Sequence, residues 1–439
     1  MWKLFKKILK PTLRILAHLT LRRFKPTVIG VTGTVGKTST KKAIAAVLST
    51  KYRVRADEVS LNTEFGFPLA ILGTYSEHDL RYIRTNSQKG HYLAKMRFWL
   101  SVIMKGWFTL LFGSRLKYPQ VIVLEYGADR PGDINYLTRI AKPQIAVITA
   151  VGDIPAHGQF YPDVESVARE KSKLIEAVVL ERGSIAFNGV VLNKDDKHVM
   201  AMYKSTMAAP ASTFGFSLDA DLCIEHFKQE VDKSKRPMGI TFQLVFRNAH
   251  SDDTIVPVRI LGAVGKAQAY AAAAAAAVGL RCGLNLATIA DALSRYQPPS
   301  HRLTIVSGIN GSLILDDSYN ASPLAVNNAL EAMYLLPAKR KVCVLGDMRE
   351  LGSLSKRAHE IVGMTVSEVC DILVTVGEEA RGIAQAAEKG GFSVKNSMSF
   401  DTVEEAITPV QNLLKSGDLV LIKASLAIGL TKLVDAVRV

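Results

Sequence analysis

The residues best suited to chemistry lie in one short stretch, residues 29–40, whose sequence is IGVTGTVGKTST. The apolar run that leads into it predicts a β-strand, and residues 41–48 are typical of a helix. Glycines have no β-carbon, so backbone N–H groups can approach phosphate oxygens, and the helix N-terminus adds positive potential. We therefore predict a phosphate-binding loop between the strand and the helix.

Each residue type in this loop suits one task. Lys37 would place its charge on the β- and γ-phosphates, and Thr38 would offer a hydroxyl to Mg²⁺. A P-loop of the usual pattern has a longer spacing between its glycines than this one, so the loop is a shortened variant. A structural turn without a ligand is the alternative. The expected nucleotide-binding residues are Gly33, Thr34, Gly36, Lys37, Thr38 and Ser39.

Composition indicates a cytosolic globular protein that binds anions. The 439 residues, 48% of them hydrophobic, can form more than one buried core. The formal charge of +15 predicts affinity for nucleotides, acidic substrates, nucleic acid or an anionic membrane. Nucleic acid is the least favoured of these, because no recognition motif accompanies the charge. Scattered cysteines and the lack of an evident signal peptide favour a reducing, cytoplasmic compartment.

Two segments combine basic and apolar residues. Residues 1–26 contain eight Lys or Arg residues and no acidic residue, and Pro11 predicts an interruption of their helical pattern. Residues 75–118 look like an insertion, and their apolar part, 98–112, is too short to span a bilayer as a helix. Both segments fit helices on the anionic inner face of a membrane. Both also fit helices packed on their own domain, and the two interpretations stay open.

Polar residues follow two predicted strands. Glu125 comes directly after the strand at 120–124, and His157 follows the strand at 144–150. Open α/β sheets bind ligands at the carboxyl ends of their strands, so Glu125 is a second candidate contact for Mg²⁺. A solvated carboxylate and an inert loop histidine are the alternatives.

Other segments are informative to different degrees. Asn62, Thr63 and Glu64 follow the helix of the phosphate loop, where a sheet fold would place a substrate-side loop. Lys171 lies in a charged helix at 163–178, and spacing alone gives it no role. The alanine-rich helix at 266–279 is interpreted as structural.

A proline pair near residue 298 marks a linker, after which strands and helices alternate again. The predicted fold class is α/β: a P-loop-containing central ATPase domain at 27–297 with a mostly parallel sheet, and a C-terminal Rossmann-like domain at 298–439. Residues 1–26 form a basic amphipathic segment ahead of them.

Seven motifs, in this order, resemble those of the Mur ligase family. They are TGTVGKT at 32–38, EYG at 125–127, PAH at 155–157, HR at 301–302, DDSYNASP at 316–323, LGDMRELG at 345–352 and LIKAS at 421–425. The motifs at 316–323 and 345–352 are most similar to the branch that adds D-alanyl-D-alanine to a muramoyl tripeptide. The resemblance runs from about residue 27 to the end, apart from 75–118.

The resemblance implies an ATP-driven amide ligase. ATP phosphorylates the carboxylate of the peptide, an amine attacks the acyl phosphate, and ADP and phosphate leave. Carried over by motif, Lys37 contacts the phosphates, Thr38 and Glu125 hold Mg²⁺, and His157 helps to hold a second metal ion. Lys171 matches a lysine that the family carbamylates, which turns a cation into a metal-binding carboxylate.

The same resemblance assigns residues of the C-terminal domain. Arg302 and Asp317 would reach the nucleotide, and Asn320 would lie near the adenine. Lys423 and Ser425 match the segment that faces the acceptor substrate.

The sequence departs from the family in three places. The 26 residues before the P-loop strand hold no counterpart of the domain that binds the uridine nucleotide. Ala267 replaces a frequent histidine, and Ala424 and Leu426 replace a glycine and an arginine. We therefore keep two alternatives to the D-alanyl-D-alanine ligase: a related ligase with another, lipid-linked acceptor, and a membrane-associated nucleotide-binding protein without ligase activity.

Overall fold

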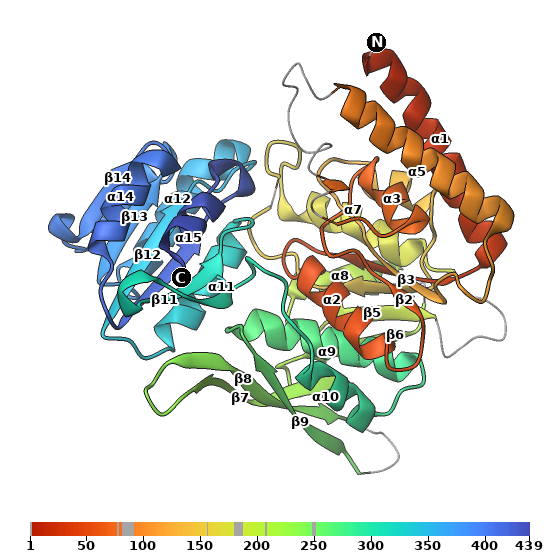
Figure 1. Ribbon diagram of the computed structural model, residues 1–439. Coiled ribbons are helices and arrows are strands. Elements are labelled where there is room, and N and C mark those ends of the chain that lie inside the picture. Colours follow the sequence, from red (N-terminus) through yellow and green to blue (C-terminus); the bar gives the residue numbers. More distant parts are fainter. Residues whose placement is uncertain are drawn as a thin grey trace.

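The structure is a computed structural model of the chain (Figure 1), and it describes all residues except 1, 77–78, 81–91, 156, 180–187, 207–208 and 248–251. Part of the segment expected as an insertion, 75–118, therefore lies outside the described residues.

Among the described residues, nine strands form the first sheet, in the order β2-β3-β1-β4-β5-β6-β7-β8-β9. The strands from β2 to β7 run parallel, and β8 and β9 continue the sheet antiparallel. The prediction of a mostly parallel sheet is confirmed. The strands are β1 Thr27–Thr32, β2 Val54–Arg55, β3 Val121–Glu125, β4 Ile145–Ile148, β5 Gly189–Asn193, β6 Ala211–Gly215, β7 Leu222–Val231, β8 Pro237–Phe246 and β9 Thr254–Leu261.

Helices cover both faces of this sheet, because successive residues of a buried strand point to opposite sides. In β1, Ile29 packs toward one buried cluster and Val28 toward the other. The first cluster contains α2 (Lys37–Leu48), α9 (Lys266–Arg281) and α10 (Leu286–Ser294). The second contains residues of α3 (Gly66–Leu72), α6 (Asp133–Thr138), α7 (Val164–Glu176) and α8 (Lys197–Thr206).

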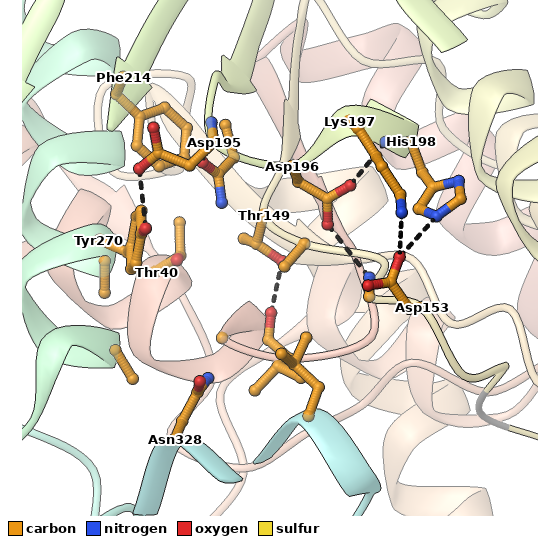
Figure 2. A pocket seen from close by; sticks show the side chains of 18 residues that line it. Thr40, Thr149, Asp153, Asp195, Asp196, Lys197, His198, Phe214, Tyr270 and Asn328 are labelled. Atoms are coloured by element: carbon orange, nitrogen blue, oxygen red, sulfur yellow. Dashed lines mark hydrogen bonds and ion pairs between the residues drawn. The ribbon is translucent and has the colours of Figure 1, made fainter. Parts of the chain in front are cut away.

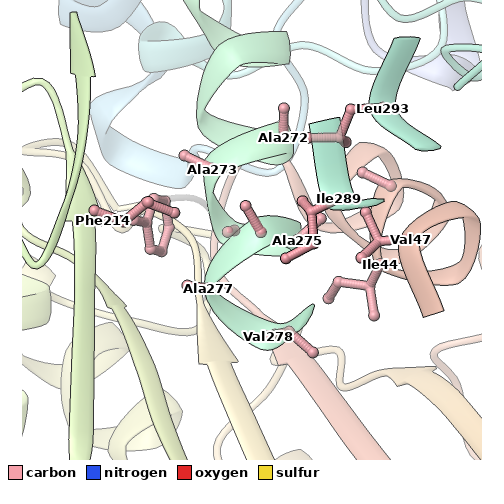
Figure 3. Close-up of a cluster of buried hydrophobic side chains, with 14 of the residues drawn as sticks. Ile44, Val47, Phe214, Ala272, Ala273, Ala275, Ala277, Val278, Ile289 and Leu293 are labelled. Atoms are coloured by element: carbon pink, nitrogen blue, oxygen red, sulfur yellow. The ribbon is translucent and has the colours of Figure 1, made fainter. Parts of the chain in front are cut away.

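The alanine-rich helix α9 is wedged against both the sheet and α2. Its run from Ala271 to Ala277 is buried, and Figure 3 shows it between Phe214 on one side and Ile44 and Val47 of α2 on the other. Small side chains allow such close approach: a β-carbon on Gly279 would lie 2.8 Å from Val47. This packing fixes α2, which begins at the phosphate loop.

Over residues 298–439, all of which the structure describes, six strands form a second sheet in the order β10-β11-β15-β12-β13-β14. Only β10 is antiparallel to its neighbour, and buried clusters lie on both faces, so the prediction of a Rossmann-like α/β domain is confirmed. The strands are β10 Thr304–Ser307, β11 Leu313–Asp317, β12 Arg340–Gly346, β13 Ile372–Val376, β14 Ser397–Phe400 and β15 Asp418–Lys423. The helices are α11 Pro323–Tyr334, α12 Ser355–Val366, α13 Arg381–Lys389, α14 Val403–Leu413 and α15 Thr431–Val437.

The N-terminal segment forms one helix, α1 (Trp2–Phe24), which runs through Pro11 without a break. The predicted interruption is therefore wrong. Proline removes one backbone hydrogen bond, but Leu13 and Leu16 of α1 are buried against α3 and α5 (Tyr92–Phe112), and this packing holds the helix together. A β-carbon on Gly106 of α5 would lie 2.4 Å from Leu16, so the two helices are in close contact.

The apolar face of α1 thus belongs to the core of the protein, and the membrane interpretation does not hold for that face. Among the described residues, no helix is long and apolar enough to cross a membrane.

We predict that Leu13→Ala lowers the free energy of unfolding by about 2–5 kcal/mol, because Leu13 is fully buried and its truncation leaves a cavity. The matched control is Ile15→Ala on the exposed side of the same helix, which should change it by less than about 0.5 kcal/mol. Urea unfolding followed by circular dichroism measures both. Equal effects would show that α1 does not pack as described.

Candidate active site

The phosphate loop lies between β1 and α2, at the carboxyl edge of the first sheet. Gly36 has a φ of 87° and directly precedes Lys37, the first residue of α2. Gly33 has a φ of 145°, and a β-carbon there would lie 2.0 Å from the Thr149 hydroxyl oxygen. Only glycine fits at Gly33, because both the backbone conformation and the neighbouring strand exclude a side chain.

Lys37 folds back over this loop. Its Nζ donates to the Gly33 carbonyl at 2.6 Å. Burial lowers the pKa of Lys37, while the carboxylates of Glu125 and Asp129 act in the opposite direction. The Thr34 hydroxyl oxygen is buried and has no hydrogen-bond partner among the described residues. The loop therefore holds a cation and an unsatisfied hydroxyl, which fit a phosphate.

Glu125 lies at the tip of β3 and is almost completely buried. Its Oε1 is 2.9 Å from Lys41 Nζ, and its Oε2 accepts a hydrogen bond of 2.8 Å from the Ser60 hydroxyl. Burial by itself would raise the pKa of Glu125, but Lys41 and the other nearby donors lower it, so the carboxylate is ionised. Lys41 also donates to the Val59 carbonyl, which fixes its position.

His157 joins the two halves of the molecule. Its Nε2 lies 3.4 Å from Asp129 Oδ1, and its Nδ1 lies 2.6 Å from Glu350 Oε2 in the loop that follows β12. Asp129 also acts electrostatically on Lys37 and on Lys171. Sequence reasoning missed Asp129, although the acidic residues after β3 were a usable signal.

Lys171 lies on the buried side of α7. Burial lowers its pKa to about 7, and the nearby charge of Lys37 acts in the same direction. Asp129 and Glu170 oppose this shift. The structure therefore brings Lys37, Glu125, Asp129 and Lys171 into one electrostatic neighbourhood. Within the described part of the chain, no three His, Cys, Asp or Glu side chains form a ready-made metal site.

Arg302 reaches the loop from the C-terminal half. Its Nη2 lies 3.5 Å from the Thr38 hydroxyl, and its guanidinium lies 4.2 Å from the centre of the Tyr319 ring. Asp317 is instead buried in a 2.5 Å ion pair with Lys423, whose Nζ also donates to the Asn320 carbonyl. Of the residues expected in the C-terminal domain, only Arg302 is seen in contact with the phosphate loop.

The remaining predicted residues have local roles. Ser425 accepts a hydrogen bond from the Arg349 amide and so supports the loop after β12. Thr63 accepts from the Gly66 amide at the start of α3, and Glu64 pairs with Lys10 of α1. Asn62 packs against Gly127 beyond the tip of β3.

A pocket of about 310 Å³ adjoins the loop (Figure 2). Ten of its eighteen lining residues are polar or charged, and the other eight are glycine, alanine, valine, leucine and phenylalanine. Tyr270 donates to Asp195 at 2.8 Å, and Asp196 accepts from the amides of Val151 and Gly152. The lining residues are Val35, Gly36, Thr40, Thr149, Ala150, Gly152, Asp153, Asn193, Asp195, Asp196, Lys197, His198, Phe214, Ala267, Tyr270, Ala271, Leu324 and Asn328.

Few local features of the sequence indicate this pocket. The sequence predicts only a structural role for the helix at 266–279, but Ala267, Tyr270 and Ala271 of α9 line the cavity. Asn320 lies outside this lining, whereas Leu324 and Asn328 of α11 belong to it. The pocket is thus closed on one side by the C-terminal half of the chain.

Comparisons with known proteins agree with this architecture. Residues 109–279 match the Mur ligase middle domain, and residues 301–426 match the glutamate ligase domain of Mur ligases. The chain belongs to the Mur ligase family. It is similar to UDP-N-acetylmuramoyl-tripeptide--D-alanyl-D-alanine ligase from Mycobacterium leprae, with 30% identity over 93% of this chain and 73% of the relative. The enzyme of that name from Bacillus subtilis is 27% identical over 96% of this chain and 78% of its own length.

Solved structures are also similar to this chain in fold. The MurF ligase from Thermotoga maritima in complex with ADP has a TM-score of 0.74 and 26% identity, over 97% of this chain and 83% of that one. FolC from E. coli, in complex with DHPP and ADP, has a TM-score of 0.59 and 19% identity, over 96% and 92% of the two chains. At that identity FolC shows a shared fold alone.

The buried pair of Lys41 and Glu125 gives a test of the site's electrostatics. Lys41→Met should lower the free energy of unfolding by about 3–5 kcal/mol, because it leaves a carboxylate buried without its partner. Lys142→Met, at an exposed position, is the matched control and should have little effect. Adding Glu125→Gln to Lys41→Met should recover part of the loss in urea unfolding. A Lys41→Met protein as stable as the control would contradict the pairing.

Proposed function

We propose that this chain is an ATP-dependent, ADP-forming ligase of peptidoglycan precursor synthesis that joins D-alanyl-D-alanine to a muramoyl tripeptide. The observation that carries the proposal is the phosphate loop, where the charges of Glu125 and Arg302 act on Lys37 and Arg302 of the second domain lies against Thr38. The relatives named for this activity match nearly the whole chain, which supports the same substrates here.

The proposed reaction has two steps. The terminal carboxylate of the peptide forms a bond to the γ-phosphorus, and the bond from that phosphorus to the β,γ-bridging oxygen breaks. The amine of D-alanyl-D-alanine then attacks the acyl carbon, loses a proton and displaces phosphate. Lys37 lies at the Gly33 carbonyl and Arg302 at the Thr38 hydroxyl, and both would neutralise the charge that passes to the leaving oxygens. Positioning and charge neutralisation account for most of the rate enhancement in such transfers.

The oxygen donors near Lys37 fit Mg²⁺, which prefers hydroxyl and carboxylate ligands. Thr38 and Glu125 would hold one ion, and His157, with Asp129 beside it, would help to hold a second. When bound, Mg²⁺ neutralises negative charge on the phosphate oxygens.

We also propose that Lys171 is carbamylated. Only a neutral amine can attack carbon dioxide, and a lysine whose pKa is about 7 has a large neutral fraction at neutral pH. The carbamate would replace the repulsion between Lys171 and Lys37 with an attraction and would supply a further oxygen ligand.

The remaining assignments complete the proposal. Residues 27–297 form the ATP-binding domain, whose pocket beside the loop takes the adenosine, and residues 298–439 close over it. Asn62, Thr63 and Glu64 face the peptide, and Lys423 and Ser425 support the acceptor side. Arg302 and Asp317 reach the nucleotide, and Asn320 lies near the adenine; Lys423, which pairs with Asp317 and donates to the Asn320 carbonyl, holds these two residues together. The reaction takes place in the cytoplasm.

One observation favours a second candidate, a ligase that acts on a lipid-linked muramoyl peptide. The expected substrate loop is fastened to the basic helix α1 through Glu64 and Lys10, so the substrate side of the site adjoins the basic segments at 1–26 and 75–118. We propose that the exposed cations of α1 and α5 hold the protein at the inner face of an anionic membrane, where a lipid-linked peptide would be available.

Purified protein with ATP and Mg²⁺ should release phosphate only when both a muramoyl tripeptide and D-alanyl-D-alanine are present. Comparing the uridine-linked with the lipid-linked peptide separates the two candidates. Lys37→Ala should lower kcat by at least about a hundredfold, because it removes a charge that acts on the transferred group. Phosphate release without either peptide would refute ligase activity.

Carbamylation of Lys171 is measurable by ¹³C NMR with labelled bicarbonate. The carbamate signal should rise as the pH increases through about 7, because the amine loses its proton there. Lys171→Arg should abolish the signal, since a guanidinium does not form a carbamate at this pH. Lys173→Arg, two residues along the same helix and paired with Glu170, is the matched control and should keep it. A signal retained in Lys171→Arg would assign the carbamate elsewhere.

A further inference from the structure

Helix α5 presents an apolar stripe to solvent. The other side of the helix is buried through Trp99, Val102 and Leu110, and the ring of Trp99 packs beside that of Phe65. The outward side chains recur at three- and four-residue spacing, so they lie on one side of the helix. Phe108 is 66% exposed and Met104 61%. We call this surface the α5 face; it consists of Met96, Leu100, Met104, Trp107, Phe108 and Leu111.

Cations surround the α5 face. Arg97 and Lys105 are exposed on α5 itself, and Arg115 and Lys117 follow its end. The adjacent helix α1 adds exposed cations and the exposed apolar side chains Ile8 and Ile15. The sequence has no acidic residue from 92 to 118 or from 1 to 26.

We propose that the α5 face docks on an anionic lipid bilayer, with α5 lying in the plane of the interface. A continuous exposed apolar stripe is costly in water and marks a binding surface. Aromatic side chains such as Trp107 and Phe108 favour the boundary between headgroups and acyl chains, and Lys and Arg beside them attract anionic lipids.

The charge pattern favours a membrane over a second copy of the chain. In a two-fold dimer the same patch meets itself, so the cations around one α5 face would lie against those of the other. No acidic side chain within residues 92–118 would offset that repulsion. An anionic bilayer instead supplies negative charge to each of the cations around the α5 face.

The position of α5 is compatible with docking. Figure 1 shows α1 and α5 side by side on the side of the molecule opposite β13 and β14, so the second sheet does not stand between α5 and a membrane. Helix α1 of this pair also contacts the expected substrate loop, because Lys10 pairs with Glu64. Docking would therefore place the substrate side of the site near the membrane surface.

The test is flotation of the purified full-length chain with vesicles, without ATP or peptide, so that its result is independent of the ligase activity. The chain should bind phosphatidylglycerol-containing vesicles and not pure phosphatidylcholine. Phe108→Ser/Leu111→Ser should weaken binding by at least about tenfold, because it removes two interfacial side chains. Arg97→Glu/Lys105→Glu should weaken binding by a similar factor, because the double change reverses two of the positive charges beside the α5 face.

Two matched controls should bind like the original chain. Leu218→Ser/Val394→Ser removes two equally exposed apolar side chains elsewhere. Lys233→Glu/Arg236→Glu makes the same change in net charge in the turn between β7 and β8. Binding that is absent in the original chain, or unchanged in both α5 variants, would overturn the proposal. A dimer in sedimentation velocity that Phe108→Ser/Leu111→Ser dissociates, without vesicle binding, would overturn it in favour of a second copy.

A spectroscopic readout guards against misfolded variants. Tryptophan emission of the original chain should shift to the blue on adding anionic vesicles, and Trp107→Phe should remove that shift. An unchanged emission spectrum in the original chain would contradict insertion of the α5 face.

Discussion

Positive charge held away from water at the carboxyl edge of the first sheet is the constraint on which the site depends. Lys41 and Lys171 are buried there, and burial also lowers the pKa of Lys37. Removing charges from water is costly unless they are paired. Lys41 has its partner in Glu125, whereas Lys37 contacts backbone carbonyls, and Lys171 has a pKa lowered toward neutrality. The site is therefore short of negative charge, which a nucleotide can supply.

The domain of the second sheet also contributes charged side chains to this site. Arg302 adds a further cation beside Thr38, and Glu350 adds a carboxylate beside His157. Both come from loops at the edge of a sheet with a separate core. A change in the separation of the two sheets would therefore alter the electrostatics of the phosphate loop.

The sequence allowed the phosphate loop and both sheets to be predicted, because glycine positions, apolar strands and the residues at strand ends are local signals. Glu125 and His157 were found for this reason. The pocket beside the loop could not be found in this way, because Asp195, Tyr270 and Asn328 come together only through the packing of α9 and α11. Pro11 misled the prediction because tertiary packing of Leu13 and Leu16 outweighs one lost hydrogen bond.

The alanine run of α9 has a mechanical consequence. Alanine has no side-chain torsion to adjust, so the alanines of α9 cannot accommodate a shift of α2 or of the sheet by changing rotamers. The phosphate loop is thus attached to closely packed elements, α2, α9 and the first sheet, which resist small displacements. A change in the position of the central domain relative to the second would therefore have to arise at the connection between α10 and β10, outside these packed elements.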